Sequence, residues 1–303
     1  MNSAQHHFGF VAIVGRPNVG KSTLLNSLLG EKLAITSPRP QTTRNRIPGI
    51  ITRPDAQIVL VDTPGIHRAK GALNRYMNNV ARDALTSCDA VLFLAEAGLG
   101  PDQNVLISAL DREILEDIRE AGLPVLLGLN KIDRVSKLML LPIIDAWRQV
   151  TEFREIVPIS GLRSDGLDRL LTSLTNALPI ATRMYAEDEL TDLPMRFLAA
   201  EMIRERLFHH LHKELPYASA VTIEAWHERA DGLIHIDAVI FVERDSQKGI
   251  VIGKGGEMLK RIGTEARAEI ERLAGARAHL SIFVRVETGW TDTEAALRKL
   301  GYL

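Results

Sequence analysis

Short apolar runs alternate with helical stretches over the first half of the chain. Stretches such as STLLNSLLG (22–30) have the pattern of a helix that stops at a glycine. Apolar strands separated by helices predict an α/β domain, a mostly parallel sheet with helices on both faces, because helical crossovers join parallel strands. The apolar runs are FGFVAIVG (8–15), AQIVLVDTPG (56–65), DAVLFLAEA (89–97), LPVLLGLNKID (123–133) and REIVPIS (154–160).

The pattern changes after residue 176. The segment NALPIATRMYAEDELTDLP (176–194) contains two prolines and several polar residues, which predicts a linker. Helix, strand, strand, helix, strand and a short terminal helix then follow, which is an α+β order. We therefore expect a first domain at 1–178, a linker at 179–195 and a smaller α+β domain at 196–303. The segments of this smaller domain are MRFLAAEMIRERLFHHLHKEL (195–215), ASAVTIEAWHER (218–229), LIHIDAVIFVER (233–244), EMLKRIGTEARAEIERLAG (257–275), HLSIFVRVE (279–287) and DTEAALRKLG (292–301).

The composition limits which cellular compartment and which binding partners we expect for this protein. A chain of 303 residues is long enough for two domains. It has no apolar run long enough to span a membrane, no recognisable secretory signal, and a single cysteine, Cys88, so we expect a cytoplasmic protein. The net charge is −1, which gives no global sign of nucleic-acid binding, although a local basic face is enough for it.

The sequence GRPNVGKS follows the first apolar run and begins a helix. It fits the phosphate-binding pattern G-x-x-x-x-G-K-[ST] in the strand–helix context that the pattern requires. Backbone N–H groups of such a loop surround the β-phosphate, Lys21 reaches the β- and γ-phosphates, and Ser22 is a ligand for Mg²⁺. The residues expected at the phosphates are Gly15, Arg16, Pro17, Asn18, Val19, Gly20, Lys21, Ser22 and Thr23.

Three later turns complete a guanine-nucleotide pattern. Asp62 in DTPG is expected to hold Mg²⁺ through water, and the Gly65 N–H to sense the γ-phosphate. Asp133 in NKID can accept two hydrogen bonds from guanine that adenine cannot donate, which argues against an ATPase. The residues expected here are Asp62, Thr63, Pro64, Gly65 and Ile66, then Asn130, Lys131, Ile132 and Asp133, then Ser160 and Gly161.

Together these motifs resemble the translation-factor-related class of P-loop GTPases. The resemblance implies that QTTRN, comprising Gln41, Thr42, Thr43, Arg44 and Asn45, is the switch I loop. Thr43 would then complete the Mg²⁺ shell, with Thr42 as the neighbouring candidate and a solvated polar loop as the alternative.

Three single positions qualify that resemblance. Ile66 stands where related proteins carry a water-positioning glutamine, so hydrolysis is expected to be slow or assisted. An asparagine at the position of Asn18 implies a K⁺ ion near the phosphates. Leu162 replaces the lysine usual in the last guanine loop, which makes a side-chain contact with guanine doubtful at that residue.

A second glycine cluster, GIVIGKGGEMLKRIG (249–263), is not a second nucleotide loop. Gly255 follows Lys254 where a serine or threonine should coordinate Mg²⁺, and a dinucleotide fingerprint fails because Met258 replaces its last glycine. The pattern G-x-x-G before a helix fits the clamp of a KH domain, which holds single-stranded RNA. A helix N-terminus with glycines for tight packing is the alternative. The expected RNA-binding residues are Lys248, Ile252, Gly253, Lys254, Gly255, Gly256, Lys260 and Arg261.

The whole chain resembles the Era family of bacterial GTPases, in which a type II KH domain follows the GTPase domain. Besides the motifs, TDLPMRFLAAEMIRE (191–205), ELPYASAV (214–221) and TGWTDTEAALRKLGY (288–302) carry this resemblance. It implies a GTP-gated assembly factor of the small (30S) ribosomal subunit that binds RNA near the 3′ end of 16S ribosomal RNA. It also implies peripheral association with the inner membrane. Separately, we expect a monomer.

An alternative function gives the C-terminal domain a partner other than RNA. Aromatic residues make up only 5% of the chain, so extensive base stacking is excluded. A GTP-dependent module whose C-terminal domain binds a protein or a membrane surface is therefore the competing interpretation.

Overall fold

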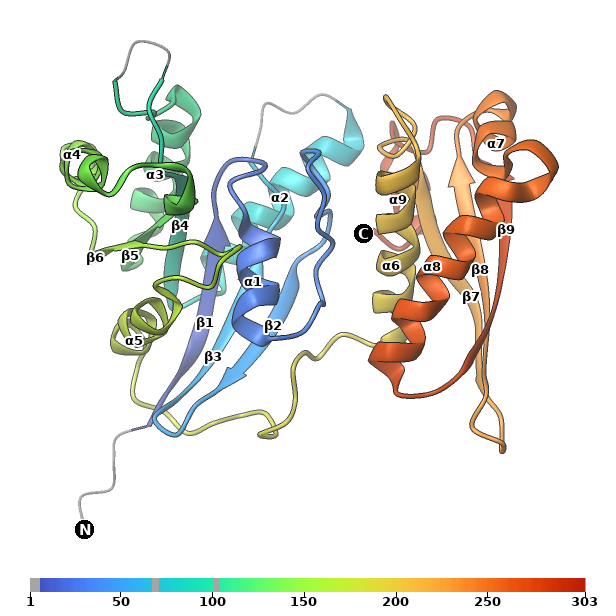
Figure 1. The fold of residues 1–303 in the computed structure, drawn as a ribbon, viewed down its shortest axis with the longest axis horizontal. Coiled ribbons are helices and arrows are strands. Elements are labelled where there is room, and N and C mark those ends of the chain that lie inside the picture. The colour runs from blue at the N-terminus through green and yellow to red at the C-terminus, as the bar shows by residue number, and fades with distance from the viewer. Residues whose placement is uncertain (1–5, 67–70, 101–103, 303) are drawn as a thin grey trace. The chain divides into compact units, whose positions relative to one another are not determined.

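The computed structural model describes residues 6–66, 71–100 and 104–302 (Figure 1). The chain forms two compact units, with the division after Asp192. Two short segments that precede the division in sequence, Ile35–Thr42 and a segment ending at Tyr76, belong to the second unit. The predicted linker at 179–195 and the domain limits beside it stay predictions.

The first unit is built on a six-stranded sheet in the order β2-β3-β1-β4-β5-β6. All neighbouring strands in it are parallel except β2 and β3. The predicted α/β class is therefore confirmed. The elements up to the division are β1 His7–Val14, α1 Lys21–Leu29, β2 Ile47–Thr52, β3 Ala56–Asp62, α2 Ala72–Thr86, β4 Ala90–Glu96, α3 Ala109–Ala121, β5 Val125–Asn130, the 3₁₀ turn η1 Ile132–Arg134, α4 Lys137–Arg148, β6 Glu155–Pro158 and α5 Leu167–Ala177. The start of α2, up to Tyr76, belongs to the second unit.

The central strands are apolar on both faces because both faces are covered. Every residue of β3 is buried, and β4 is buried up to its last residue, Glu96. One core cluster joins side chains of β1, β4 and β5 to α2, α3 and α4, with Phe93 against the fully buried Trp147 of α4. This packing fixes the ends of the parallel strands, where all the nucleotide motifs lie.

The edge strand β2 is not among the apolar runs that the sequence analysis identified. Its sequence, IPGIIT, contains a proline and a glycine, which weaken a strand pattern. A proline is tolerated here because β2 lies at the edge of the sheet and pairs with one neighbour, β3. Sequence periodicity alone does not identify a strand of this kind.

The second unit is an α+β domain with a three-stranded sheet, β7-β8-β9. Strands β7 and β8 are antiparallel, whereas β8 and β9 are parallel. Helices α6 and α8 lie on the same face of this sheet (Figure 1), where Ile203, Ile240 and Ile270 share one core cluster. The elements are α6 Met195–His210, β7 Ala220–Glu228, β8 Ile234–Val242, α7 Asp245–Ile252, the 3₁₀ turn η2 Lys254–Gly256, α8 Glu257–Ala274, β9 Ala278–Val286 and α9 Glu294–Lys299.

Two details of this unit differ from the sequence expectation. The helix predicted over 195–215 ends at His210, because Leu211 is extended and buries its side chain. The short helix α7 was not predicted, since its sequence DSQKGIVI combines a glycine with β-branched residues. Helix α7 leads directly into the second glycine cluster, so it determines where that loop begins.

A search of the described helices for a membrane span finds no candidate that is both long and apolar enough.

Candidate functional site

The loop Gly15–Gly20 connects the end of β1 to the start of α1. Gly20, the residue before α1, has φ +103°, which side chains rarely adopt. A Cβ atom there would lie 2.5 Å from Nδ2 of Asn130, so the position has no room for one. Glycine therefore allows the loop to close against β5 beside the N-terminus of α1, the kind of position where backbone N–H groups can bind an anion.

Asn130 connects two of the predicted loops. Its side chain is 3% exposed, its Nδ2 donates to the carbonyl oxygen of Val19 at 2.8 Å, and its Oδ1 accepts from the Gly161 N–H at 2.9 Å. The end of β5 thus holds the phosphate loop and the last guanine loop together. Asn130 acts here by positioning backbone, a role that the NKID motif alone does not reveal.

Lys21 is buried at the base of the phosphate loop. Its ammonium group donates to the carbonyl oxygens of Gly15 at 3.0 Å and Arg16 at 3.1 Å. Burial lowers the pKa of Lys21 to about 8, and the charge of Asp62 opposes that shift. The side chain is therefore held inside the loop that is expected to receive the phosphates.

Ser22, Thr43 and Asp62 come together from three elements. The Ser22 hydroxyl donates to Oδ2 of Asp62 at 2.7 Å, and the Thr43 hydroxyl donates to the same oxygen at 3.2 Å. The two hydroxyl oxygens lie 2.9 Å apart. Thr43, rather than Thr42, contributes its side chain to this cluster.

The Asp62 carboxylate is fully buried, and burial raises its pKa above the ordinary value, against the effects of Lys21 and the two hydroxyls. Its other oxygen, Oδ1, has no hydrogen-bond partner among the described residues. A buried carboxylate oxygen without a partner is costly unless a cation compensates it. The three oxygen donors and the unpartnered Oδ1 fit Mg²⁺, which prefers oxygen ligands.

Asp133 and Ser160, both predicted to lie at the guanine, come together in the structure. The Ser160 hydroxyl donates to Oδ1 of Asp133 at 2.6 Å, and this hydrogen bond lowers the pKa of Asp133. Ser160 therefore orients the carboxylate that is predicted to recognise guanine. Lys131 is directed to Glu96 instead, at 2.7 Å, and Leu162 is 76% exposed.

The predicted switch I loop is divided between the two compact units. Thr43 and the residues after it belong to the first unit, whereas Gln41 and Thr42 belong to the second. Arg204 of α6 donates to the carbonyl oxygen of Thr42 at 2.6 Å. Arg204 is itself buried and paired with Glu201 at 2.6 Å, so the residue that contacts the backbone next to Thr43 belongs to a buried ion pair.

The segment after DTPG is only partly described. Ile66 is buried in the core cluster of the first unit, so its apolar side chain packs against protein. Residues 67–70, which follow Ile66 in sequence, lie outside the described residues.

One ion pair of the phosphate loop was missed by the sequence analysis. Arg16 Nε lies 2.8 Å from Oδ1 of Asp111, whose side chain is fully buried at the start of α3. Asp111 also forms a capping box with Ser108. The S-x-x-D spacing signals a helix start, but nothing in it reveals the partner in the phosphate loop.

The second glycine cluster forms a tight loop between α7 and α8. Gly253, Gly255 and Gly256 have φ values of +73°, +61° and +83°, all in the left-handed region. Side chains would strain this backbone, which explains the three glycines within four residues. Ile252, by contrast, packs against the core of the second unit.

The cations around this loop are not equivalent. Arg261 Nε pairs with Glu265 at 3.3 Å. The side chains of Lys248, Lys254 and Lys260 make no ion pair or hydrogen bond within the described part of the chain. Three of the four predicted cations are therefore available to an external anion.

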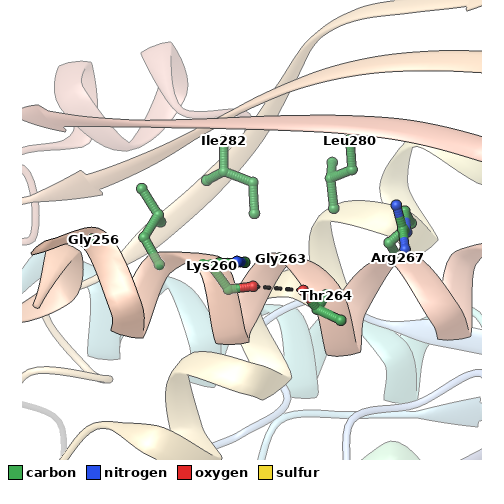
Figure 2. Close-up of a pocket in the computed structure, with 8 residues that line it drawn as sticks. Gly256, Lys260, Gly263, Thr264, Arg267, Leu280 and Ile282 are labelled. Carbon is green, nitrogen blue, oxygen red and sulfur yellow. Dashed lines mark hydrogen bonds between the residues drawn. The ribbon is translucent and has the colours of Figure 1, made fainter.

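A groove of about 370 Å³ extends from the loop along α8 and β9. Figure 2 shows Leu280 and Ile282 of β9 pointing toward the helix that carries Lys260, Thr264 and Arg267. One wall is thus apolar, and the other carries polar and cationic groups. Arg267, missed by the sequence analysis, has no side-chain partner within the described residues. Its spacing of seven residues from Lys260, two helical turns, could have identified it.

Comparisons with known proteins agree with both halves of this description. A family model described as 50S ribosome-binding GTPase matches residues 10–131, and a KH domain model matches residues 214–291.

Full-length relatives share the same organisation. The GTPase Era of Geotalea uraniireducens is 52% identical over 302 residues, covering all of both chains. The GTPase Era of Lacticaseibacillus paracasei is 49% identical, covering 99% of this chain and 98% of the other.

Two solved structures superpose on nearly the whole chain. An Aquifex aeolicus Era variant bound to GDP and aluminium fluoride matches with a TM-score of 0.91 and 38% identity. An Era complex with MgGDPNP and nucleotides 1506–1542 of 16S ribosomal RNA matches with a TM-score of 0.91 and 39% identity. Each comparison covers 98% of this chain and 99% of the other.

Replacing Asn130 with alanine should weaken GDP and GTP binding by about tenfold or more. The substitution leaves the Val19 carbonyl and the Gly161 N–H without their partner, and both loops then lose their position. Titration with a fluorescent guanine nucleotide measures the change. The matched control is Asn176→Ala at the end of α5, and equal affinity in both variants would contradict the bridging role.

Proposed function

This chain belongs to the Era family of GTPases, and on that basis we propose that it couples GTP binding and hydrolysis to the binding of ribosomal RNA. The RNA is single-stranded and lies near the 3′ end of 16S ribosomal RNA, and the process served is assembly of the 30S subunit. The observation that best supports RNA binding is the groove beside Gly253–Gly256, because it has one apolar wall and one cationic wall next to the glycine loop.

The phosphate site binds and orients the triphosphate. The N–H groups of the loop Gly15–Gly20 and the Lys21 ammonium hold the phosphates. Ser22, Thr43 and Asp62 would hold Mg²⁺, which neutralises charge on the β- and γ-phosphates when it is bound.

Hydrolysis is slow in the free protein because Ile66 has no group that can orient water. We propose that K⁺ near Asn18 supplies positive charge to the reacting phosphates. Asn18 has φ +64°, a conformation that asparagine tolerates better than most residues.

Guanine is selected by the Asp133 carboxylate, oriented by Ser160. A carboxylate can accept hydrogen bonds from N1–H and the exocyclic amine of guanine together. Adenine would leave this acceptor without donors, which costs binding free energy.

RNA binds along α8, with its backbone at the glycine loop and its bases in the groove. Loops of this kind allow close approach of a sugar–phosphate backbone. Lys254 and Lys260 attract phosphates, and binding therefore weakens as salt concentration rises.

A change of the bound nucleotide affects the RNA domain through the backbone at Thr42 and Thr43. Thr43 belongs to the cluster with Ser22 and Asp62, and Thr42 is held by Arg204 of α6. Any movement of Thr43 on loss of the γ-phosphate therefore acts on a contact with a helix of the RNA domain. Order–disorder switching of this loop is the general behaviour of GTPases.

We further propose a monomeric, cytoplasmic protein. Peripheral association with the inner membrane is carried over from the family resemblance alone.

Replacing Asp133 with asparagine should shift selectivity from guanine toward xanthine nucleotides. Xanthine offers an oxygen where guanine offers its amine, so an amide donor suits it better. Competition of XTP and GTP for a fluorescent nucleotide measures the shift. Unchanged preference for GTP would exclude Asp133 from base recognition.

Replacing Lys254 with aspartate should weaken RNA binding by about tenfold while leaving GTP affinity unchanged. A repulsive charge in the clamp acts directly on a phosphate, and it should also reduce the salt dependence of binding. Filter binding with an RNA of 16S nucleotides 1506–1542 provides the measurement.

Lys137→Asp, at the start of α4, is the matched control because it changes net charge equally outside the RNA domain. Equal RNA affinity in wild type and Lys254→Asp would argue strongly against the clamp.

A further inference from the structure

Asp111 is a buried carboxylate that lies outside every predicted nucleotide motif. It belongs to the first turn of α3, and its side chain is fully buried. Its oxygen Oδ2 accepts from the N–H of Ser108 at 2.9 Å and from the Ser108 hydroxyl at 2.8 Å, which completes the cap at the start of the helix. The cap uses one oxygen of the carboxylate, and the other oxygen, Oδ1, has a different partner.

That partner is Arg16, the second residue of the phosphate loop. Its Nε donates to Oδ1 of Asp111 at 2.8 Å, and the Arg16 side chain is 22% exposed. Because Asp111 is fully buried, moving Arg16 away from it would leave a buried charge without compensation, which is strongly unfavourable. The ion pair therefore favours one position of Arg16 relative to the start of α3.

The backbone of Arg16 in turn holds the lysine of the phosphate loop. The Lys21 ammonium donates to two carbonyl oxygens, that of Gly15 at 3.0 Å and that of Arg16 at 3.1 Å. Gly15 is packed against β4, since a Cβ atom on it would collide with the carbonyl oxygen of Leu94. Of the two residues whose carbonyl groups hold Lys21, one is thus placed by close backbone packing and the other by its ion pair with Asp111.

We infer that Asp111 is a positioning residue for nucleotide binding, which acts through Arg16 on Lys21. The inference rests on the proposed function and adds to it a residue of α3. The Asp111 carboxylate holds the Arg16 side chain, and the Arg16 carbonyl oxygen accepts from the ammonium of Lys21. A lysine at this place in a phosphate loop binds the β- and γ-phosphates. Loss of the Asp111 charge therefore weakens contacts with those two phosphates and leaves recognition of the base unchanged.

Asp117 provides a matched control on the same helix. It also pairs with an arginine, Arg82 of α2, at 3.2 Å, but this pair lies at the surface, where the Arg82 side chain is 59% exposed. Exposed ion pairs contribute little to stability because water and salt screen them. Asp117→Asn therefore makes the same chemical change as Asp111→Asn, in the same helix and opposite the same type of partner, at a residue whose partner is outside the phosphate loop.

The test measures binding of GMP, GDP and a non-hydrolysable GTP analogue to the full-length wild type and to both variants, by competition with a fluorescent guanine nucleotide. Asp111→Asn should weaken binding of GDP and of the GTP analogue by about tenfold or more, because asparagine keeps the shape of the side chain but offers no charge to Arg16. GMP lacks the two phosphates that Lys21 binds, so its affinity should not change. Asp117→Asn should match the wild type for all three nucleotides.

Three outcomes would overturn the inference. The first is equal GDP affinity in the wild type and Asp111→Asn, which would leave the proposed function standing. The second is an equal loss for GMP, GDP and the GTP analogue, which would mean that the substitution damages the whole nucleotide site. Absence of guanine-nucleotide binding by the wild type would overturn the proposed function and the inference together.

Arg16→Met tests the same contact from its other end, even if Asp111→Asn destabilises α3. Methionine removes the charge and keeps an unbranched, flexible side chain. Arg16→Met should weaken binding of GDP and of the GTP analogue but not of GMP, and unchanged GDP affinity in this variant would contradict the inference. The double variant should bind GDP no more weakly than the weaker single variant, because both changes break one contact. Additive losses would mean that Arg16 and Asp111 act separately, which also overturns the inference.

Discussion

The nucleotide site depends on a carboxylate that the fold buries without fully satisfying. Asp62 is at the end of a strand whose residues are all buried, and one of its oxygens has no partner among the described residues. Such a group is unfavourable until a cation reaches it. The residues around it are arranged accordingly, since Ser22 and Thr43 both donate to its other oxygen and Lys21 lies beneath the phosphate loop. In the proposed function, Mg²⁺ and the triphosphate compensate this unfavourable burial.

In the proposed function, the same cluster connects nucleotide binding to RNA binding. Thr43 belongs to the nucleotide site, and the residue before it is held through its backbone by a buried ion pair of the second compact unit. Glu201 and Arg204 are both nearly inaccessible to water, so this ion pair is shielded from solvent. Thr42 and Thr43 are thus neighbouring residues that belong to different units.

Backbone patterns were predictable from the sequence, whereas partnerships between distant side chains were not. The positions of glycine and proline residues, together with apolar runs, identified the phosphate loop, the parallel strands and the G-x-x-G loop. The edge strand Ile47–Thr52 was missed because its proline is acceptable only at an edge, which is a property of the sheet. The contact of Asn130 with Val19 and the pairing of Arg16 with Asp111 each join residues more than ninety positions apart, and no local sequence pattern indicates them. Arg267 could have been predicted as a residue of the groove, since its helical spacing from Lys260 places both on the same face of α8.

RNA affinity measured in the two nucleotide states tests the central claim, that the nucleotide in the first domain controls RNA binding by the second. The direct measurement is the Kd of the full chain for an RNA of 16S nucleotides 1506–1542, with Mg²⁺ and either a non-hydrolysable GTP analogue or GDP. Coupling of ordinary size predicts tighter binding by about fivefold or more with the GTP analogue. Equal Kd values in the two nucleotide states would contradict the account, even if both ligands bind.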